Sequence, residues 1–241
     1  MNVFAIGDLH LDSAGEKPMD VFGPQWTGHF EKISADWLAR VCEDDLVLIP
    51  GDISWAMQLE QARTDLETIG RLPGLKVLCR GNHDYWWSGI GRLRSVLPRG
   101  MYAIQNDALR FGDVTVCGTR GWTLPGTSGA TADDVRIFER EVGRLRLSLE
   151  AADRLGGELI AMMHYPPLPE DGAPTPVSRL LSEHHVKRLV YGHLHGPAGR
   201  SAFNGELDGV RYDCVACDQI HFSLALIRQD VQVTAPVGRQ T

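Results

Sequence analysis

Short apolar runs alternate with amphipathic stretches over most of the chain. Six runs of five or six residues are mainly apolar and partly β-branched, which is typical of strands buried in a sheet. They cover residues 2–6, 45–50, 75–79, 114–119, 158–163 and 186–191. We therefore expect buried strands at these places.

Three longer stretches place apolar residues three or four positions apart, which is the period of an amphipathic helix. They cover residues 30–41, 57–72 and about 132–155. In the first stretch, the predicted apolar stripe comprises Phe30, Ile33, Trp37, Leu38 and Val41. Thr131 is the expected N-cap of the third helix, and Gly156 follows its end.

The alternation of strands and helices predicts an α/β protein with layered sheets flanked by helices. Further apolar segments near the C-terminus are predicted to be antiparallel strands, at 209–216, 221–227 and 231–235. No internal repeat or linker divides the chain, so we expect a single domain over residues 1–241 that ends in a frayed tail after about Ala235. Long loops are candidates for functional segments, at 12–28, 122–131 and 165–176.

Composition narrows the possible settings and partners. Hydrophobic residues make up 43% of the 241 residues, enough for a sizeable core. The net charge of −7 and the lack of a basic stripe argue against general binding to nucleic-acid backbones. No apolar run approaches the roughly 18 residues of a membrane span, and the N-terminus is not typical of a signal peptide. Five cysteines without framework spacing, Cys214 and Cys217 among them as core residues, predict a cytoplasmic protein.

Polar side chains follow five of the predicted strands directly. Because the carboxyl ends of strands in an α/β sheet share one edge, these side chains should meet there. They are Asp8 and His10, then Asp52, then Asn82, His83 and Asp84, then His164, and finally His193 and His195.

Such a cluster requires positive charge to hold it together. Desolvated carboxylates repel each other and would take up protons, whereas divalent cations accept mixed Asp, Asn and His ligands. Seven residues are candidate metal ligands: Asp8, His10, Asp52, Asn82, His164, His193 and His195. If Asp52 bridges, two sites of four ligands each result, with positions open for water and substrate, unlike a closed structural zinc site.

Each of these residues also has an ordinary structural explanation when taken alone. Asp8 or Asp52 could cap a helix, His164 could be a hydrogen-bonded core histidine, and Asn82 could form an Asx-turn. Asp84 could cap a following helix. The ordered recurrence at five strand ends favours the metal site over these independent coincidences.

Together the motifs resemble the calcineurin-like metallophosphoesterase superfamily. Its pattern of D-x-H, G-D, G-N-H-[DE], a lone H and G-H-x-H appears in order between residues 8 and 195, as "DLH", "GD", "GNHD", His164 and "GHLH". The resemblance implies a four-layer α-β-β-α sandwich with two mixed sheets. It also implies that one metal is held by Asp8, His10 and His195, the other by Asn82, His164 and His193, and that Asp52 bridges both.

The resemblance further implies a dinuclear phosphoesterase that hydrolyses a phosphate mono- or diester by direct attack of a metal-bound hydroxide. His83 would face the substrate and either protonate the leaving alkoxide or stabilise phosphoryl charge. Asp84 would orient His83, fix its tautomer and favour its imidazolium form. Manganese, iron and zinc all suit such ligands.

The expected substrate is a phosphorylated small molecule or nucleotide. A nuclease or nucleotide phosphodiesterase is the alternative. A non-catalytic scaffold is a third hypothesis, but the sequence keeps every candidate ligand, which argues against it. Motifs of serine hydrolases, P-loop proteins and dinucleotide-binding proteins are absent from the sequence. For Arg120 a surface salt bridge is favoured over a phosphate contact. Trp55, Trp86 and Trp87 are expected to be packing residues rather than rings that stack on a substrate. Trp122 and His221 stay open as substrate contacts.

Overall fold

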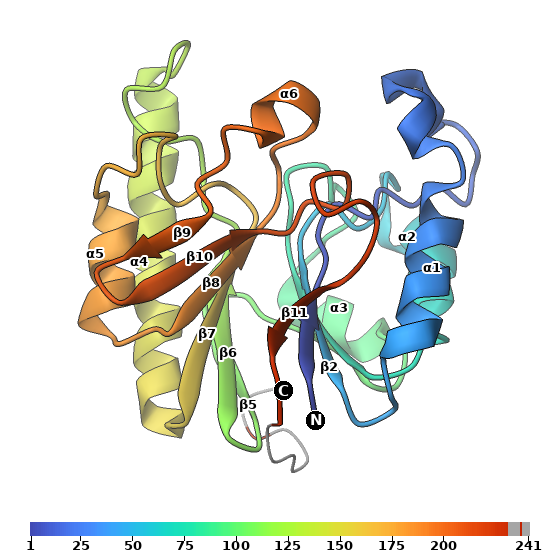
Figure 1. The fold of residues 1–241 in the computed structure, drawn as a ribbon, viewed down its shortest axis with the longest axis horizontal. Coiled ribbons are helices and arrows are strands. Elements are labelled where there is room, and N and C mark those ends of the chain that lie inside the picture. The colour runs from blue at the N-terminus through green and yellow to red at the C-terminus, as the bar shows by residue number, and fades with distance from the viewer. Residues whose placement is uncertain (231–236, 238–241) are drawn as a thin grey trace.

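The computed structural model describes residues 1–230 and residue 237. Two β-sheets face each other, and helices cover the outer face of each (Figure 1). The predicted strand at 231–235 and the predicted tail beyond it lie outside the described residues.

The first sheet has five strands in the order β11-β1-β2-β3-β4, with β1 to β4 parallel and β11 antiparallel to β1. Their bounds are β1 Val3–Ala5, β2 Leu46–Pro50, β3 Leu75–Cys79, β4 Met101–Ala103 and β11 Ala225–Arg228. The helices that follow these strands along the chain are α1 His29–Arg40, α2 Leu59–Gly70 and α3 Ile90–Val96.

The second sheet has six strands in the order β5-β6-β7-β8-β10-β9, with β6, β7, β8 and β10 parallel and antiparallel strands at both edges. Their bounds are β5 Ala108–Phe111, β6 Val114–Thr119, β7 Glu158–Met163, β8 Arg188–Tyr191, β9 Gly205–Leu207 and β10 Val210–Cys214. Helices α4 Ala132–Leu155 and α5 Pro176–Glu183 lie against its outer face (Figure 1).

The strand alternation explains the four layers. In β1 and β2, Phe4, Val47 and Ile49 belong to the apolar cluster shared with α1 and α2. Their neighbours Val3 and Leu48 belong to a second cluster, which includes residues of β6 and β7 and fills the space between the sheets. A third cluster joins the second sheet to α4 and α5. The chain therefore forms the predicted α-β-β-α sandwich with two mixed sheets.

The predicted antiparallel group at the C-terminus is wrong. Strand β10 is parallel to β8, and β11 crosses to the other sheet to pair with β1. The chain between them is not strand, so the predicted segment 221–227 becomes a strand only at Ala225–Arg228. Leu38 is also wrong as a core residue, because its side chain is 63% exposed on the outer side of α1.

Thr131 caps α4 as predicted, and its hydroxyl accepts a hydrogen bond from the Asp134 amide. Two short 3-10 helices, η1 Met19–Phe22 and η2 Pro24–Trp26, lie within the long loop that follows β1. The short helix α6 Gly196–Gly199 follows β8. These elements lie at the end of the molecule opposite the N-terminus (Figure 1). None of the helices within residues 1–230 combines the length and apolarity needed to cross a bilayer.

Candidate metal centre

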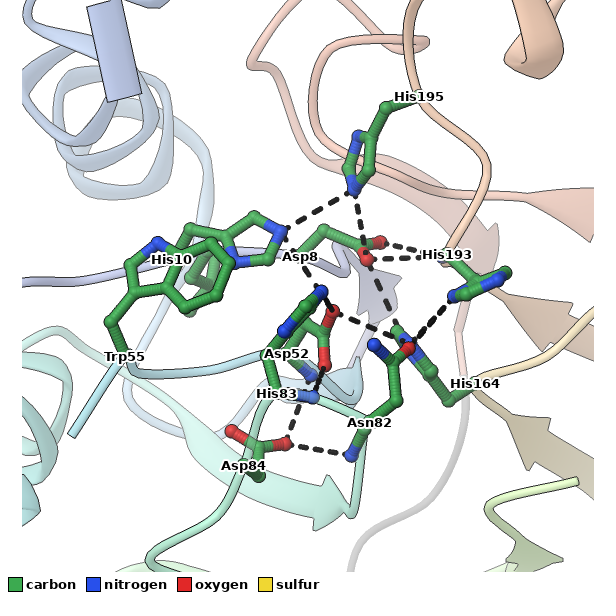
Figure 2. Close-up of polar contacts among 12 residues, drawn as sticks. Asp8, His10, Asp52, Trp55, Asn82, His83, Asp84, His164, His193 and His195 are labelled. Atoms are coloured by element: carbon green, nitrogen blue, oxygen red, sulfur yellow. Dashed lines mark hydrogen bonds and ion pairs between the residues drawn. The ribbon is translucent and has the colours of Figure 1, made fainter. Parts of the chain in front are cut away.

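The carboxyl ends of β1, β2, β3, β7 and β8 meet at one place, where the two sheets adjoin. The structure brings all seven sequence-predicted ligands together there, with His83 at the edge of the cluster (Figure 2). A backbone bridge from Gly7 to Ala216 links the end of β1 to the end of β10. The gathering of these side chains follows from the parallel direction of the strands that carry them.

One group of candidate ligand atoms lies beside β1 and β8. His195 Nε2 is 3.2 Å from Asp8 Oδ1 and 3.4 Å from His10 Nε2. The donor atoms of these three residues all lie within 4.8 Å of one another. This spacing places two imidazoles and a carboxylate around a common point, as a bound cation requires.

A second group lies toward β7. Asn82 Oδ1 is 2.7 Å from His164 Nε2 and 2.8 Å from His193 Nδ1, and the two ring nitrogens are 3.2 Å apart. Asp52 lies between the groups, because its Oδ2 is 3.4 Å from His164 Nε2 and 3.8 Å from His10 Nε2. The position of Asp52 fits a carboxylate shared by both groups.

The tautomer of His164 shows why the second group fits a cation. Its Nδ1 lies 3.1 Å from the Pro50 carbonyl and can only donate to it. Burial lowers the pKa of His164 and favours the neutral ring, whose Nε2 lone pair then points at Asn82 Oδ1. Two acceptors at that distance repel each other unless a positive charge lies between them. Hydrogen bonding of the remote ring nitrogen to a carbonyl is also the usual way in which proteins orient a metal-binding histidine.

The electrostatics of the cluster lead to the same conclusion. Burial, followed by the Asp8 charge, raises the pKa of Asp52 to about 8. Burial also lowers the pKa of His193 to about 3. For His195, burial opposes the charged form, but Asp8 and Asp218 outweigh it and raise the pKa to about 10. Burial alone would raise the pKa of Asp8, but His195 and the other imidazoles hold it below its usual range. Asp52 is therefore the carboxylate of this pair that lacks positive charge, which divalent cations would supply.

Backbone strain is concentrated at the same residues. Asp8, His10, Asp52 and His193 have φ values of 60°, 46°, 50° and 73°, in a region that non-glycine residues rarely occupy. Each such residue costs on the order of 1–3 kcal/mol and is typical of functional sites. Left-handed backbone at four candidate ligands indicates that the local backbone is shaped by the site rather than by folding stability.

The glycines of two motifs are required by close approach. A Cβ at Gly192 would overlap the Asp8 carboxylate, and a Cβ at Gly81 would overlap the carboxylate and the backbone nitrogen of Asp52. The motifs G-H-x-H and G-N-H thus need glycine, because a side chain at Gly192 or Gly81 would displace the aspartate that packs against it.

The prediction that Asp84 orients His83 is wrong. Asp84 is fully buried and accepts hydrogen bonds from the amides of Gly81, Asp52, Ile53 and Ser54 and from the Trp86 indole. His83 Nδ1 has no hydrogen-bond partner among the described residues, and burial lowers the pKa of His83 instead of favouring its imidazolium. Asp84 instead joins the loop after β2 to the loop after β3, and so positions Asp52 and Asn82. It caps no helix.

His83 itself lies where a substrate could reach it. Its side chain is 36% exposed, and its Nε2 is 4.0 Å from Asp52 Oδ2. The ring packs against Trp55, with centroids 4.4 Å apart. His83 therefore faces solvent from the edge of the cluster, in contrast to the fully buried His164.

Asp218 is a site residue that the sequence reasoning missed. Its Oδ1 accepts a hydrogen bond from His195 Nδ1 at 2.8 Å, and its Oδ2 accepts one from the Gly196 amide at 2.8 Å. These bonds leave His195 Nε2 free toward Asp8 and hold α6 against the cluster. The sequence did contain a signal for Asp218, because this residue follows shortly after the apolar segment 209–216. Position after an apolar segment is also what identified the other candidate residues.

We expect Asp218→Asn to weaken metal binding by about 10- to 100-fold, the usual effect of removing a carboxylate that orients a metal-binding histidine. Titration of the metal-free protein with Mn²⁺ by calorimetry measures this directly. The matched control is Asp208→Asn, in an exposed turn at a left-handed backbone position that asparagine tolerates. Equal affinities of the two variants would show that Asp218 has no such role.

Several other sequence candidates have structural roles. Arg120 Nη2 is 3.7 Å from Glu141, which confirms the predicted salt bridge, but the pair is largely buried and not at the surface as predicted. The Arg120 guanidinium also stacks on Trp122, whose indole donates to Asp134. Trp86 and Trp87 are buried packing residues, whereas Trp55 lies beside the cluster. His221 does not begin a strand and instead occupies a turn before β11.

A sequence profile described as "calcineurin-like phosphoesterase" matches residues 1–197. No curated protein matches the chain. The solved structure of a protein of unknown function, AQ665 from Aquifex aeolicus, aligns with a TM-score of 0.49 and 14% identity over 93% of this chain and 94% of that chain. GAP50, the anchor in the inner membrane complex of Plasmodium, aligns with a TM-score of 0.50 and 14% identity over 90% of this chain and 71% of that chain. At this identity the likeness to GAP50 concerns the fold alone.

Proposed function

Because the chain belongs to the calcineurin-like phosphoesterase family, we propose that it is a dinuclear metal-dependent hydrolase of a phosphate mono- or diester. The observation that carries this proposal is the convergence of two groups of donor atoms with Asp52 between them. A purely structural cluster would not require two adjacent groups of metal-donor atoms beside a partly exposed imidazole.

The geometry supports a specific set of metal ligands. We assign Asp8, His10 and His195 to one ion, Asn82, His164 and His193 to the other, and Asp52 to both. Asp8 also offers an oxygen close to Asp52 and His164. Manganese, iron and zinc all suit this set of oxygen and imidazole donors. When bound, the ions would activate a water molecule and neutralise charge on the phosphoryl oxygens.

The protein's own residues supply the remaining functions. His83 is the candidate acid or hydrogen-bond donor to the substrate, because its side chain is partly exposed at the edge of the cluster and its Nε2 lies 4.0 Å from Asp52 Oδ2. Asp84 positions the loops that carry Asp52 and Asn82. Asp218 holds His195 in the tautomer that points Nε2 inward. The Trp55 ring excludes water from one side of His10 and His83.

We favour a phosphorylated small molecule or nucleotide as substrate over a nucleic acid, since the net charge is −7. A nuclease or nucleotide phosphodiesterase remains the alternative within the same chemistry. A non-catalytic scaffold is disfavoured because the cluster retains every donor that a metal site needs. All five cysteines are unpaired, which supports a reducing, cytoplasmic setting.

The proposal is tested with purified protein and Mn²⁺ against p-nitrophenyl phosphate, bis-p-nitrophenyl phosphate and cyclic nucleotides. We expect hydrolysis of at least one ester class, loss of activity on complete chelation, and recovery when Mn²⁺ is restored. Comparison of the two p-nitrophenyl esters distinguishes a monoesterase from a diesterase. Inertness toward every ester would favour the scaffold, and hydrolysis that survives chelation would contradict a metal-dependent mechanism.

A further inference from the structure

A cavity of about 320 Å³ opens directly beside the candidate metal centre. Its walls include Met19, Phe22, Trp26, Trp55 and Pro197, and three imidazoles of the cluster, including that of His83, form the adjoining side. Its volume is at the lower end of the range for small-molecule sites. The walls come from the loop after β1, the loop after β2 and helix α6, so chain segments distant in sequence form one site.

The aromatic walls are in contact with the proposed ligands. Trp55 stacks on His10 with ring centroids 4.8 Å apart and an interplanar angle of 17°. Trp26 meets His195 edge-on, with centroids 5.5 Å apart and an angle of 66°. If the phosphorus of a substrate lies at the cluster, a substituent on it that points toward these rings enters the cavity directly.

The chemistry of the lining restricts what can occupy it. Within the described part of the chain, no Asp, Glu, Lys or Arg side chain lines the cavity, and Gln25 is the one polar side chain besides the imidazoles. A charged organic group would be poorly solvated there, whereas a flat uncharged ring would replace water against aromatic surfaces. His83 faces the same cavity, so this is the side from which a leaving group could receive a proton.

We propose that this cavity binds a flat, uncharged ring in the leaving group of the substrate, so that the enzyme prefers ring-bearing phosphoesters to small alkyl ones. The proposal rests on the proposed function. Hydrolysis forms a P–O bond from water and breaks the P–O bond to the ring-bearing group, whose oxygen leaves with a proton. The ring can be an aryl group or a nucleobase, since both present the same planar surface.

Two adjacent residues of η1 provide a matched test. Phe22 lines the cavity and is 63% exposed, whereas Val21 is 73% exposed and does not line it. Because neither side chain is buried, replacement of either by alanine should leave the fold intact, which thermal unfolding would verify. Neither residue belongs to the proposed metal or proton-transfer machinery.

The experiment measures binding of phenylphosphonate and methylphosphonate to the Mn²⁺-loaded protein by calorimetry, because neither phosphonate can be hydrolysed at its C–P bond. The wild type should bind phenylphosphonate about tenfold more tightly than methylphosphonate. Phe22→Ala should reduce that preference about fivefold, near the lower end of the effect of removing one aromatic platform. Val21→Ala should leave it unchanged.

A second pair of ligands identifies the kind of ring. Adenosine monophosphate and ribose 5-phosphate differ by the nucleobase, so tighter binding of the former that Phe22→Ala weakens would indicate a nucleobase pocket. A preference confined to phenylphosphonate would indicate an aryl pocket.

Equal binding of phenyl- and methylphosphonate by the wild type, or equal effects of the two substitutions, would overturn the proposal. Because binding is measured without turnover, failure of the ring pocket and failure of phosphoester hydrolysis give separate results.

Discussion

Replacement of Asp52 by asparagine is expected to lower phosphoester hydrolysis by about 10³-fold or more, because one carboxylate is proposed to serve both metal ions. Asp52 Oδ2 lies 3.8 Å from His10 Nε2 and 3.4 Å from His164 Nε2. Asparagine keeps the size of the side chain but removes the negative charge that two cations would share. Activity and the metal content of the purified variant should therefore fall together.

The control for this variant is Asp133→Asn. Asp133 is an exposed residue in the first turn of α4, where it pairs with Arg136 at 3.0 Å. An exposed ion pair of this kind contributes at most about 1 kcal/mol, so its loss should leave metal content and turnover near the wild-type values. An Asp52→Asn protein that retains both metals and full turnover would refute the shared-carboxylate assignment.

Replacement of His83 by asparagine is expected to lower kcat by about 10²- to 10⁴-fold, which is the usual contribution of a positioned general acid. His83 is at the exposed edge of the cluster, 4.0 Å from Asp52 Oδ2, and its Nδ1 has no partner within the described residues. Metal content should stay at the wild-type level, since His83 is not among the proposed ligands.

Steady-state kinetics and elemental analysis of the same sample distinguish a histidine that donates a proton to the substrate from one that binds metal. His184→Asn is a suitable control, because His184 pairs with Asp153 on the outer surface and should affect neither quantity. A His83→Asn protein that is purified without metal would show that His83 is a ligand and that the proposed assignment is incorrect.

The buried strands and the long helix were predictable because each carries a local pattern. Strand runs such as 159–163 are continuous and apolar, since both of their faces are covered. Helix α4 has a long apolar stripe, a threonine cap and a terminal glycine, so its bounds agree with the predicted ones. The short strands β4 and β5 and the helix α3 were missed, because a few residues are too short a window for periodicity.

The tail shows where local pattern fails. The segments that became β10 and β11 have the composition of strands, but strand direction and sheet membership depend on partners distant in the chain. The same limitation explains Leu38, whose helical spacing matched the stripe although its side chain faces solvent. Local spacing defines a face only approximately, and the packing of α1 on the sheet determines which positions are covered.

At the site, the sequence by itself determined which residue types follow which strands, and parallel strand direction then placed them at one edge. Which side chains touch was decided only in three dimensions. Asp84 sits next to His83 in the chain, but four backbone amides surround its carboxylate and satisfy it. Asp218, 23 positions beyond His195, provides the bond that orients that ring. Hydrogen bonds form between atoms that the folded backbone brings within reach, and neighbourhood in the chain is a poor guide to that distance.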